Sequence, residues 1–248
     1  MGRWLVAFLL MVGVMHAASM HASYRVEYGI FGKMGISDAY LTQDDEHYKI
    51  KIIAKATGLA KILSRGRIEV YESEGKVVNG RLVPEIFRKD IRRLGKQRLK
   101  EYYFDHRKKR VTYVETRYRK NQLQSESNGT LPYYAEDDIL SLYFNIPMII
   151  EDCSKPFNQF LKAVGAEKNT GRVKVETVTR KTKEKMRPLL GDASCYLKVT
   201  VYQKLFGSKG GELYLALRSD NVVQKAVLKD VIMFGDIRGK LIHFDETK

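Results

Sequence analysis

An alternation of apolar and polar residues with a period of two recurs along most of this chain, and it limits the fold more than any other feature. It is clearest in residues 24–30 and 48–54, and it returns around 68–70, 102–104, 197–201 and 213–217. Successive side chains of a β-strand point to opposite faces of the sheet, so this pattern predicts strands with one buried face and one wet face. Such strands pair antiparallel, because parallel strands are covered on both faces and read as continuous apolar runs.

Short clusters of glycine, asparagine and acidic residues separate these segments and predict tight turns. They lie at Gly32–Gly35, Asp44–Glu46, Glu74–Gly75, Asn79–Gly80, Gly95, Gly207–Gly211 and Asp220–Asn221. Strands joined in this way form a meander. No fixed-period repeat and no Pro/Ser/Gly-rich linker divides the chain, so we expect a single β-rich domain over residues 23–248.

One segment departs from the alternation and predicts a helix. The acids Glu136–Asp138 precede an apolar run that reaches Ile146 and stops at Pro147. Acids at a helix start interact favourably with its free amides, which predicts a helix over Asp138–Ile146 that is apolar nearly all round. Such a helix must be covered. Phe157–Val164 is expected to add a second helical turn or two, and Gly58–Leu63 a short helical bend.

These elements together predict the fold class. We expect a mainly β protein with a single curved antiparallel sheet, a half-barrel or open barrel, and one or two short helices against its concave face. The helix over Asp138–Ile146 would then be buried by the sheet that curves round it.

The first 22 residues have the pattern of a secretory signal peptide. Arg3 precedes the apolar run Leu5–Val14, and the small residues Ala17, Ser19 and Ala22 follow. The apolar run is too short to span a bilayer, and no later segment reaches the roughly 20 apolar residues that a membrane span needs. We therefore expect a periplasmic protein, cleaved after Ser19 or Ala22, with no transmembrane segment in the mature chain.

The chain is strongly basic, with 44 Lys and Arg against 29 Asp and Glu and a formal charge of +15. Such a charge favours polyanions, and export argues against nucleic acid. The remaining candidate partners in the envelope are anionic lipid, lipopolysaccharide phosphate and an acidic wall polymer. The simpler alternative is that the lysines are only solvated. The basic runs Arg88–Lys100 and Arg107–Arg110 include turns that a meander places at opposite ends of the sheet, so we expect the charge to be spread.

The motifs of common enzymes and metal sites are missing from the sequence. Ser141 lies in Leu-Ser-Leu rather than Gly-x-Ser-x-Gly, and no phosphate-binding glycine loop is visible. Cleavage after Ala22 would leave His47, His106 and His243, with no His-x-x-x-His spacing, so we expect no metal and no cofactor. Adjacent carboxylates at positions 136–138 could serve acid/base chemistry, but helix capping explains them without a catalytic role.

Two modification sites are predicted. Cys153 and Cys195 are the only cysteines, and an exported chain with two of them permits one disulfide, the alternative being two buried thiols. Asn128 stands in Asn-Gly-Thr, a glycosylation acceptor in a polar stretch expected to be a loop, and Glu126 stands two residues before it. Chance occurrence of so short a motif is the alternative there.

Several segments, taken in order, resemble domain of unknown function 3108, a family of exported bacterial proteins. They are Tyr24–Gly29 with Gly32 and Gly35, Lys55–Ala60, Tyr103–Asp105, Asp138–Tyr143 and Gly211–Leu215. The resemblance implies a periplasmic all-β protein with no established activity, whose curved sheet is similar to the half-barrels of periplasmic lipoprotein carriers. The basic segments Arg117–Thr130 and Arg180–Arg187 depart from the family pattern.

These observations lead to two hypotheses of function. The first is a non-enzymatic periplasmic protein that binds or carries a lipid or lipoprotein acyl chain in an apolar groove between the helix and the first strands, lined by Tyr28, Ile52, Leu142 and Phe144. The second is an envelope scaffold or assembly factor with a filled core that contacts wall polymer or a protein partner. An open cavity beneath the helix would favour the first and a filled core the second.

Overall fold

Most of the chain forms strands of one large open sheet in the computed structural model, which describes residues 18–29, 32–202, 211–231 and 235–247. The strand order is β8-β7-β6-β5-β4-β3-β2-β1-β15-β14-β13-β12-β11-β10-β9. Every neighbouring pair is antiparallel except the short parallel contact of β9 with β10. The mainly β, antiparallel fold predicted from the alternation is confirmed, and the sheet does not close, since β8 and β9 stand at its two ends.

The strands are β1 (Ala18–Tyr28), β2 (Lys33–Gln43), β3 (His47–Ala56), β4 (Ile68–Val78), β5 (Arg81–Arg93), β6 (Lys96–Asp105), β7 (Arg110–Arg119), β8 (Gln122–Thr130), β9 (Asp137–Asp138), β10 (Asn158–Val164), β11 (Arg172–Thr177), β12 (Cys195–Val201), β13 (Glu212–Leu217), β14 (Val223–Val231) and β15 (Gly235–Thr247). The helices are α1 (Gly58–Leu63), α2 (Ile139–Ile149) and α3 (Arg180–Leu190). The helical bend expected at Gly58–Leu63 is confirmed by α1.

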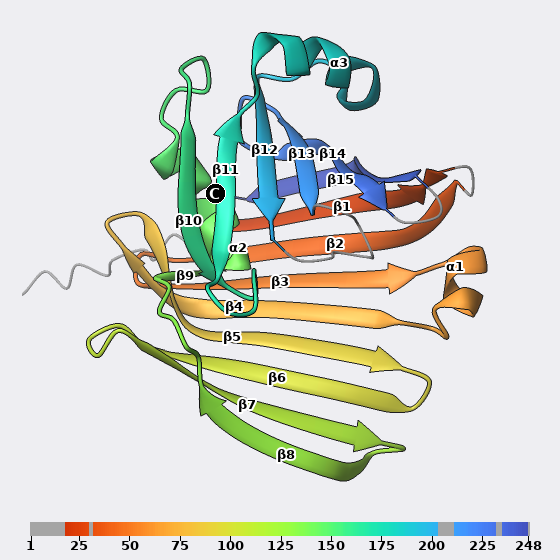
Figure 1. Ribbon diagram of the computed structural model, residues 1–248, viewed down its shortest axis with the longest axis vertical. Coiled ribbons are helices and arrows are strands. Elements are labelled where there is room, and N and C mark those ends of the chain that lie inside the picture. Colours follow the sequence, from red (N-terminus) through yellow and green to blue (C-terminus); the bar gives the residue numbers. More distant parts are fainter. Residues whose placement is uncertain (1–17, 30–31, 203–210, 232–234, 248) are drawn as a thin grey trace, which may run out of the picture.

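Helix α2 lies inside the curve of the sheet. Figure 1 shows β10 to β12 crossing the direction of β3 to β8 steeply, with α2 behind β11. One side of α2 contributes Leu142 and Ile146 to an apolar cluster with residues of β10 to β14. Another side contributes Leu140 and Phe144 to a cluster with β3, β5, β6 and β7. A helix that is apolar nearly all round is therefore covered from two directions, as its composition requires.

The helix does not stop at Pro147, as its sequence predicted, but continues to Ile149. Proline removes one hydrogen bond from a helix and does not by itself force the chain out of it. The Ile150 N–H still donates to the Ile146 carbonyl at 2.8 Å, so the last turn closes around the proline. Packing of Ile146, Ile149 and Ile150 in the cluster with β10 to β14 holds this turn.

Two further segments differ from their predictions. Phe157–Val164 is not helical, because residues 158–164 form β10, paired with β11 on one side and β9 on the other. Glu126–Thr130 is not a loop, because it belongs to β8, which pairs with β7. Short segments carry a weak local signal, and pairing with neighbouring strands of the sheet decided both.

Local chemistry explains several of the turns. Asn79 and Gly80 have positive φ values of 51° and 77°, the conformation of the two-residue hairpin turn that Asn-Gly favours. The pairing of β4 with β5 shifts register between Glu74 and Gly75. A Cβ at Gly75 would lie 2.1 Å from the Val83 carbonyl oxygen, so only glycine fits this close approach of two strands.

Many basic residues of the sheet form ion pairs with nearby acids, and the basic runs lie apart from one another. Arg98 and Arg117 both bond Glu115, and the first of these bonds leads the causes that lower the pKa of Glu115 to about 2. Arg88 bridges Glu74 and Glu101 at 2.7 and 2.9 Å. The turn at Gly95 and the turn at 107–109 stand at opposite ends of β6, so these basic runs do not combine into one patch.

The start of the sheet bears on the predicted signal segment. Strand β1 begins at Ala18 and pairs with both β2 and β15, so the expected boundary after Ala22 falls within a central strand. Ala22 itself is fully buried. The apolar run Leu5–Val14 lies outside the described residues.

Candidate functional site

The first turn of α2 carries a buried polar network centred on Asp138. Its carboxylate accepts hydrogen bonds from the Leu140 and Ser141 amides at 2.7 and 3.1 Å, and Ser141 Oγ accepts in return from the Asp138 amide at 3.0 Å. Ser73 Oγ of β4 donates to the same carboxylate at 2.5 Å and bonds the Tyr48 hydroxyl at 2.9 Å. Burial raises the pKa of Asp138 to about 6. The capping role predicted for the acidic run therefore belongs to Asp138.

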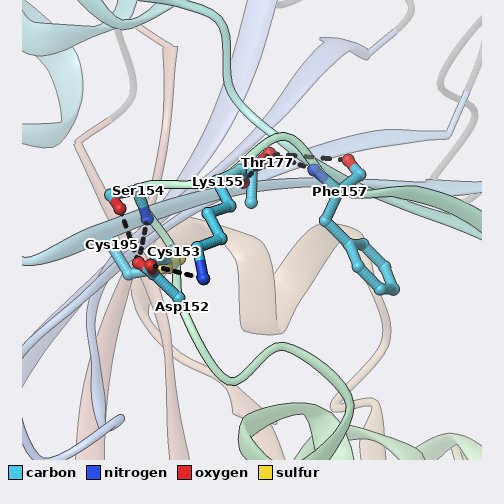
Figure 2. Close-up of a disulfide and its surroundings, with 7 residues drawn as sticks. All are labelled: Asp152, Cys153, Ser154, Lys155, Phe157, Thr177 and Cys195. Carbon is cyan, nitrogen blue, oxygen red and sulfur yellow. Dashed lines mark hydrogen bonds and ion pairs between the residues drawn. A yellow bond between two sulfur atoms is a disulfide. The ribbon is translucent and has the colours of Figure 1, made fainter.

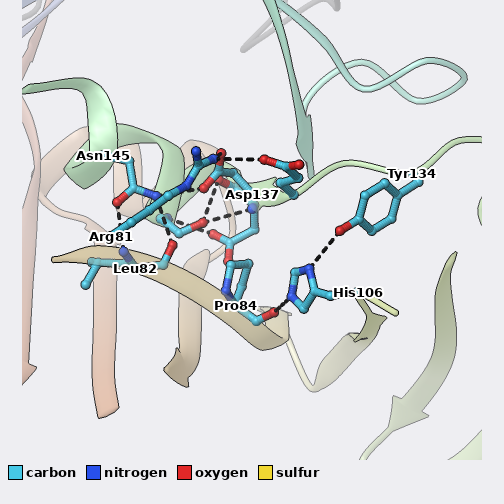
Figure 3. Close-up of polar contacts among 10 residues, drawn as sticks. Arg81, Leu82, Pro84, His106, Tyr134, Asp137 and Asn145 are labelled. Carbon is cyan, nitrogen blue, oxygen red and sulfur yellow. Dashed lines mark hydrogen bonds and ion pairs between the residues drawn. The ribbon is translucent and has the colours of Figure 1, made fainter. Parts of the chain in front are cut away.

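Asp137 has a different set of partners, which fasten α2 to the hairpin of β4 and β5. Figure 3 shows Arg81 reaching Asp137, and the two atoms lie 2.6 Å apart. Asn145 Nδ2 donates to the other Asp137 oxygen at 2.7 Å and also to the Leu82 carbonyl, while its Oδ1 accepts from the Leu82 amide. Burial raises the pKa of Asp137 as well. The Asn145 side chain thus bonds both backbone polar groups of Leu82, as a neighbouring strand would.

A second polar link lies beside this one. His106 bonds the Pro84 carbonyl at 2.6 Å and the Tyr134 hydroxyl at 2.8 Å (Figure 3). Both ring nitrogens of His106 thus have partners within the protein, which favours a structural role for this histidine.

A cavity with a volume of about 390 Å³ adjoins this network. Its wall is formed by α2, by β10 and by the segment that leads into β9. Leu142, Ile149 and Leu161 are its aliphatic lining, while Arg81, Lys109 and Lys162 supply positive charge. Tyr134, Ala135, Glu136 and Asp137 complete it. The cavity therefore combines an apolar surface with cationic groups.

The three cations differ in their availability. Arg81 is engaged by Asp137 at 2.6 Å and by Glu136 at 3.4 Å. Lys109 and Lys162 make no ion pair with any residue that the structure describes. Two ammonium groups at an apolar cavity can attract an anionic group that Arg81 alone would not bind.

The structure does not bring the four predicted groove residues together. Ile52 and Phe144 pack in one apolar cluster, while Leu142 belongs to the other and also lines the cavity. Tyr28 ends β1 opposite Ile237 of β15 and belongs to neither cluster within the described residues. The space between α2 and β3 is filled by side chains such as Ile50 and Phe87, both fully buried.

Sequence reasoning missed Arg81, Lys109 and Lys162, the basic residues of the cavity. They come from the start of β5, the turn between β6 and β7, and β10. No spacing in the sequence connects them, because three different loops and strands bring them to one place. Arg81 stands directly after the Asn79–Gly80 turn and Lys109 lies in the basic run Arg107–Arg110, but Lys162 carried no local signal.

The two cysteines form a disulfide between the segment after α2 and the first residue of β12. Their Cα atoms lie 5.6 Å apart, with a sequence separation of 42. Figure 2 shows the neighbouring turn, in which the Asp152 carboxylate accepts from the Ser154 amide at 2.8 Å and from its hydroxyl at 2.6 Å. A smaller cavity of about 140 Å³ lies beside Cys153 and Cys195.

Asn128 occupies an exposed position of the edge strand β8, opposite Val114 of β7. Its side chain is accessible, but its backbone is held in the sheet rather than in the loop that was predicted. The mass of the intact native protein, from a host that glycosylates asparagine, tests whether Asn128 carries a glycan.

None of the helices in the described residues has the length and apolar character that crossing a membrane requires.

Comparisons with known proteins identify the family of this chain. No curated protein matches the sequence. The crystal structure of a β-barrel-like protein of domain of unknown function DUF1849 from Brucella abortus is similar over 95% of this chain and 100% of that chain, with 11% identity and a TM-score of 0.47. The model of DUF3108, described as a protein of unknown function, matches residues 23–241, and the chain belongs to this family.

Proposed function

We propose that this protein is a non-enzymatic, exported protein of the cell envelope that binds an anionic amphiphile in the cavity beside α2. The observation that carries the proposal is the composition of that cavity. Leu142, Ile149 and Leu161 offer an apolar surface, and Lys109 and Lys162 offer charge that no described acid neutralises. A volume of about 390 Å³ is within the usual range of small-molecule sites.

The groove first expected between α2 and the early strands is replaced in this proposal by the neighbouring cavity. A filled interior leaves an acyl chain no room beneath the helix. The cavity beside α2 is open to a ligand whose apolar part lies on the aliphatic residues and whose acidic group meets the two lysines. The ligand class is therefore a fatty acid or another lipid with an acidic head.

Two features support the compartment and the absence of catalysis in this proposal. Disulfides persist in oxidising compartments such as the periplasm, which agrees with the predicted signal segment. Glu136 and Asp137, the acids that line the cavity, both pair with Arg81. A general acid or base would need a carboxyl that can reach a substrate.

Native mass spectrometry of protein recovered from the periplasm tests the proposal, because a bound amphiphile adds its own mass. Titration with a fluorescent fatty acid then locates the site. Lys109→Ala and Lys162→Ala should each weaken binding, and Lys108→Ala, the neighbouring lysine outside the cavity, should not. Equal binding by all three variants would contradict the proposal.

A second candidate function, that of an envelope scaffold, is favoured by the filled interior and by an exposed aromatic group on the sheet. Phe160 of β10 and Tyr202 after β12 are 52% and 44% exposed. The guanidinium of Arg172 lies 4.0 Å from the Phe160 ring centre and 5.3 Å from that of Tyr202. Such a stack offers a surface for a polymer or a protein.

Cosedimentation with purified wall polymer distinguishes the two functions. A scaffold should cosediment, and Phe160→Ala should weaken this, while Leu123→Ala on the exposed edge strand should not. An amphiphile-binding protein without scaffold function should stay in the supernatant.

A further inference from the structure

Three adjacent strands bring histidines and acids to one face of the sheet. Strand β1 lies between β2 and β15, and His21 stands opposite Asp245 of β15 and Tyr40 of β2. Ser23 stands opposite His243 and Asp38 in the same way. Ala22, between His21 and Ser23, is fully buried and points inward. His21 and Ser23 therefore point away from α2, to the outer face.

The side chains of this group lie close together. The donor atoms of His21, His243 and Asp245 all lie within 4.8 Å of one another. The two imidazole rings are 5.5 Å apart between centres, and His243 Nε2 bonds the Asp245 carboxylate. Asp38 Oδ1 lies 3.6 Å from His21 Nε2, so a second carboxylate stands at the edge of the group.

Neighbouring residues hold two of these side chains in place. The Tyr40 ring stacks on His21 with 4.4 Å between centres and 5° between planes. Ser23 Oγ donates to Asp38 at 2.5 Å and lies 3.2 Å from His21 Nε2. Supporting contacts of this kind orient the ligands of metal sites.

We propose that His21, His243 and Asp245 bind a divalent transition-metal ion, with Asp38 or water as the fourth ligand. Two imidazoles and a carboxylate suit Zn²⁺ and its neighbours in the first row, whereas Ca²⁺ and Mg²⁺ prefer oxygen ligands alone. Bonds of about 2.0–2.1 Å place ligand atoms about 3.4 Å apart in a tetrahedral site. His243 and Asp245 are exposed and can close the difference by side-chain rotation.

No spacing in the sequence indicated this site, and the proposal revises the expectation of no metal. Helical metal motifs repeat after three or four residues, but these ligands are two apart on β15 and more than 200 positions from β1. The pairing of β1 with β15 near the two ends of the chain joins them. The site also needs His21 in the mature protein, and cleavage after Ala22 would remove it.

Isothermal titration of the exported, metal-stripped protein with Zn²⁺ tests the proposal, after mass spectrometry has fixed its first residue. One Zn²⁺ should bind per chain. His21→Ala and His243→Ala should each weaken binding by at least about tenfold, the loss that even a supporting residue of a metal site causes. His47→Ala is the matched control, since His47 is exposed at the start of β3 and lies outside the group. The affinity of this variant for Zn²⁺ should equal that of the parent.

Three results would overturn the proposal: no Zn²⁺ binding by the parent, equal weakening by His47→Ala, or a mature chain that begins at Ser23. Circular dichroism of each variant verifies that the sheet is retained. The fatty-acid titration is a separate measurement, because the cavity beside α2 is on the opposite face of the sheet from His21.

Discussion

Asp138 combines a helix cap with complete burial, and its protonation should therefore affect stability. Burial raises the pKa of Asp138 to about 6 in the folded protein, above the 3.8 of an ordinary aspartate. The folded state thus holds this proton more tightly than the unfolded state. The stabilisation is fully present below about pH 4 and is lost as the pH rises through about 6.

Asp138→Asn should remove this dependence, because asparagine also caps a helix and does not titrate. The free energy of unfolding of the variant, minus that of the parent, should increase between pH 4 and pH 7 in urea titrations. Asp138→Ala is the control for the cap and should be less stable than Asp138→Asn by about 0.5–2 kcal/mol. A difference between Asp138→Asn and the parent that does not change with pH would contradict this assignment.

Phe144 distinguishes a filled interior from an open groove. Its ring packs in the cluster of α2 with β3, β5, β6 and β7 and lies edge-to-face with Tyr143, 5.0 Å between centres. Phe144→Ala should cost about 3 kcal/mol in denaturant titrations, the lower end for such a truncation, because the ring is half-buried. Met148→Ala, on an exposed position of the same helix, should change stability by less than about 0.5 kcal/mol. Similar small losses in both variants would instead indicate a groove at Phe144.

At the scale of elements, the pairing of strand β1 limits where a signal peptidase can cut without removing part of the sheet. Residues 19–22 pair with β2 on one side and with β15 on the other, so this part of β1 is central in the sheet. Cleavage after Ala22 would remove these pairs and would uncover the residues that Ala22 contacts. Cleavage after Ser19 removes only the first two residues of the strand.

We therefore predict that the exported protein begins at Met20. Amino-terminal sequencing of periplasmic material verifies this directly. A chain that begins at Ser23 would show that the strand tolerates the loss, and an intact Met1 on periplasmic protein would contradict the predicted signal segment.

At the scale of the whole molecule, the chain passes from one end of the sheet to the other within a few residues. Strand β8 is the first in the sheet order and β9 the last, yet only residues 131–136 separate them in sequence. This short link draws the two ends of the sheet toward each other around α2. The disulfide then joins the segment after α2 to β12, across the interior.

The disulfide should contribute substantially to stability, since it closes a loop with a sequence separation of 42. In the chain-entropy model a loop of this size contributes roughly 3–4 kcal/mol. The double variant Cys153→Ala, Cys195→Ala should lose about this amount in urea titrations, and the parent should match it after reduction. Thiol counting on the denatured, unreduced protein should find none free, and two free thiols would exclude the bond.

The sequence by itself determined the strands that show period-two alternation, most turns and the start of α2, because these depend on neighbouring residues. Period-two alternation predicts a half-buried strand wherever it occurs, Asn79–Gly80 favours its turn, and Asp138 can cap a helix from its own position. Burial of α2 also followed from its composition, since an apolar helix must be covered. The count of cysteines permitted a single disulfide pairing, while the structure decided between that bond and two buried thiols.

Only the tertiary structure decided the character of Phe157–Val164 and Glu126–Thr130, which became strands by pairing with β11 and β9 and with β7. It also decided the extension of α2 through Pro147, where packing against β10 to β14 outweighed one lost hydrogen bond. The cavity cations and the His21 group come from separate strands and turns. Contacts between such distant positions leave no periodic signal, because their spacing depends on the path of the whole sheet rather than on local geometry.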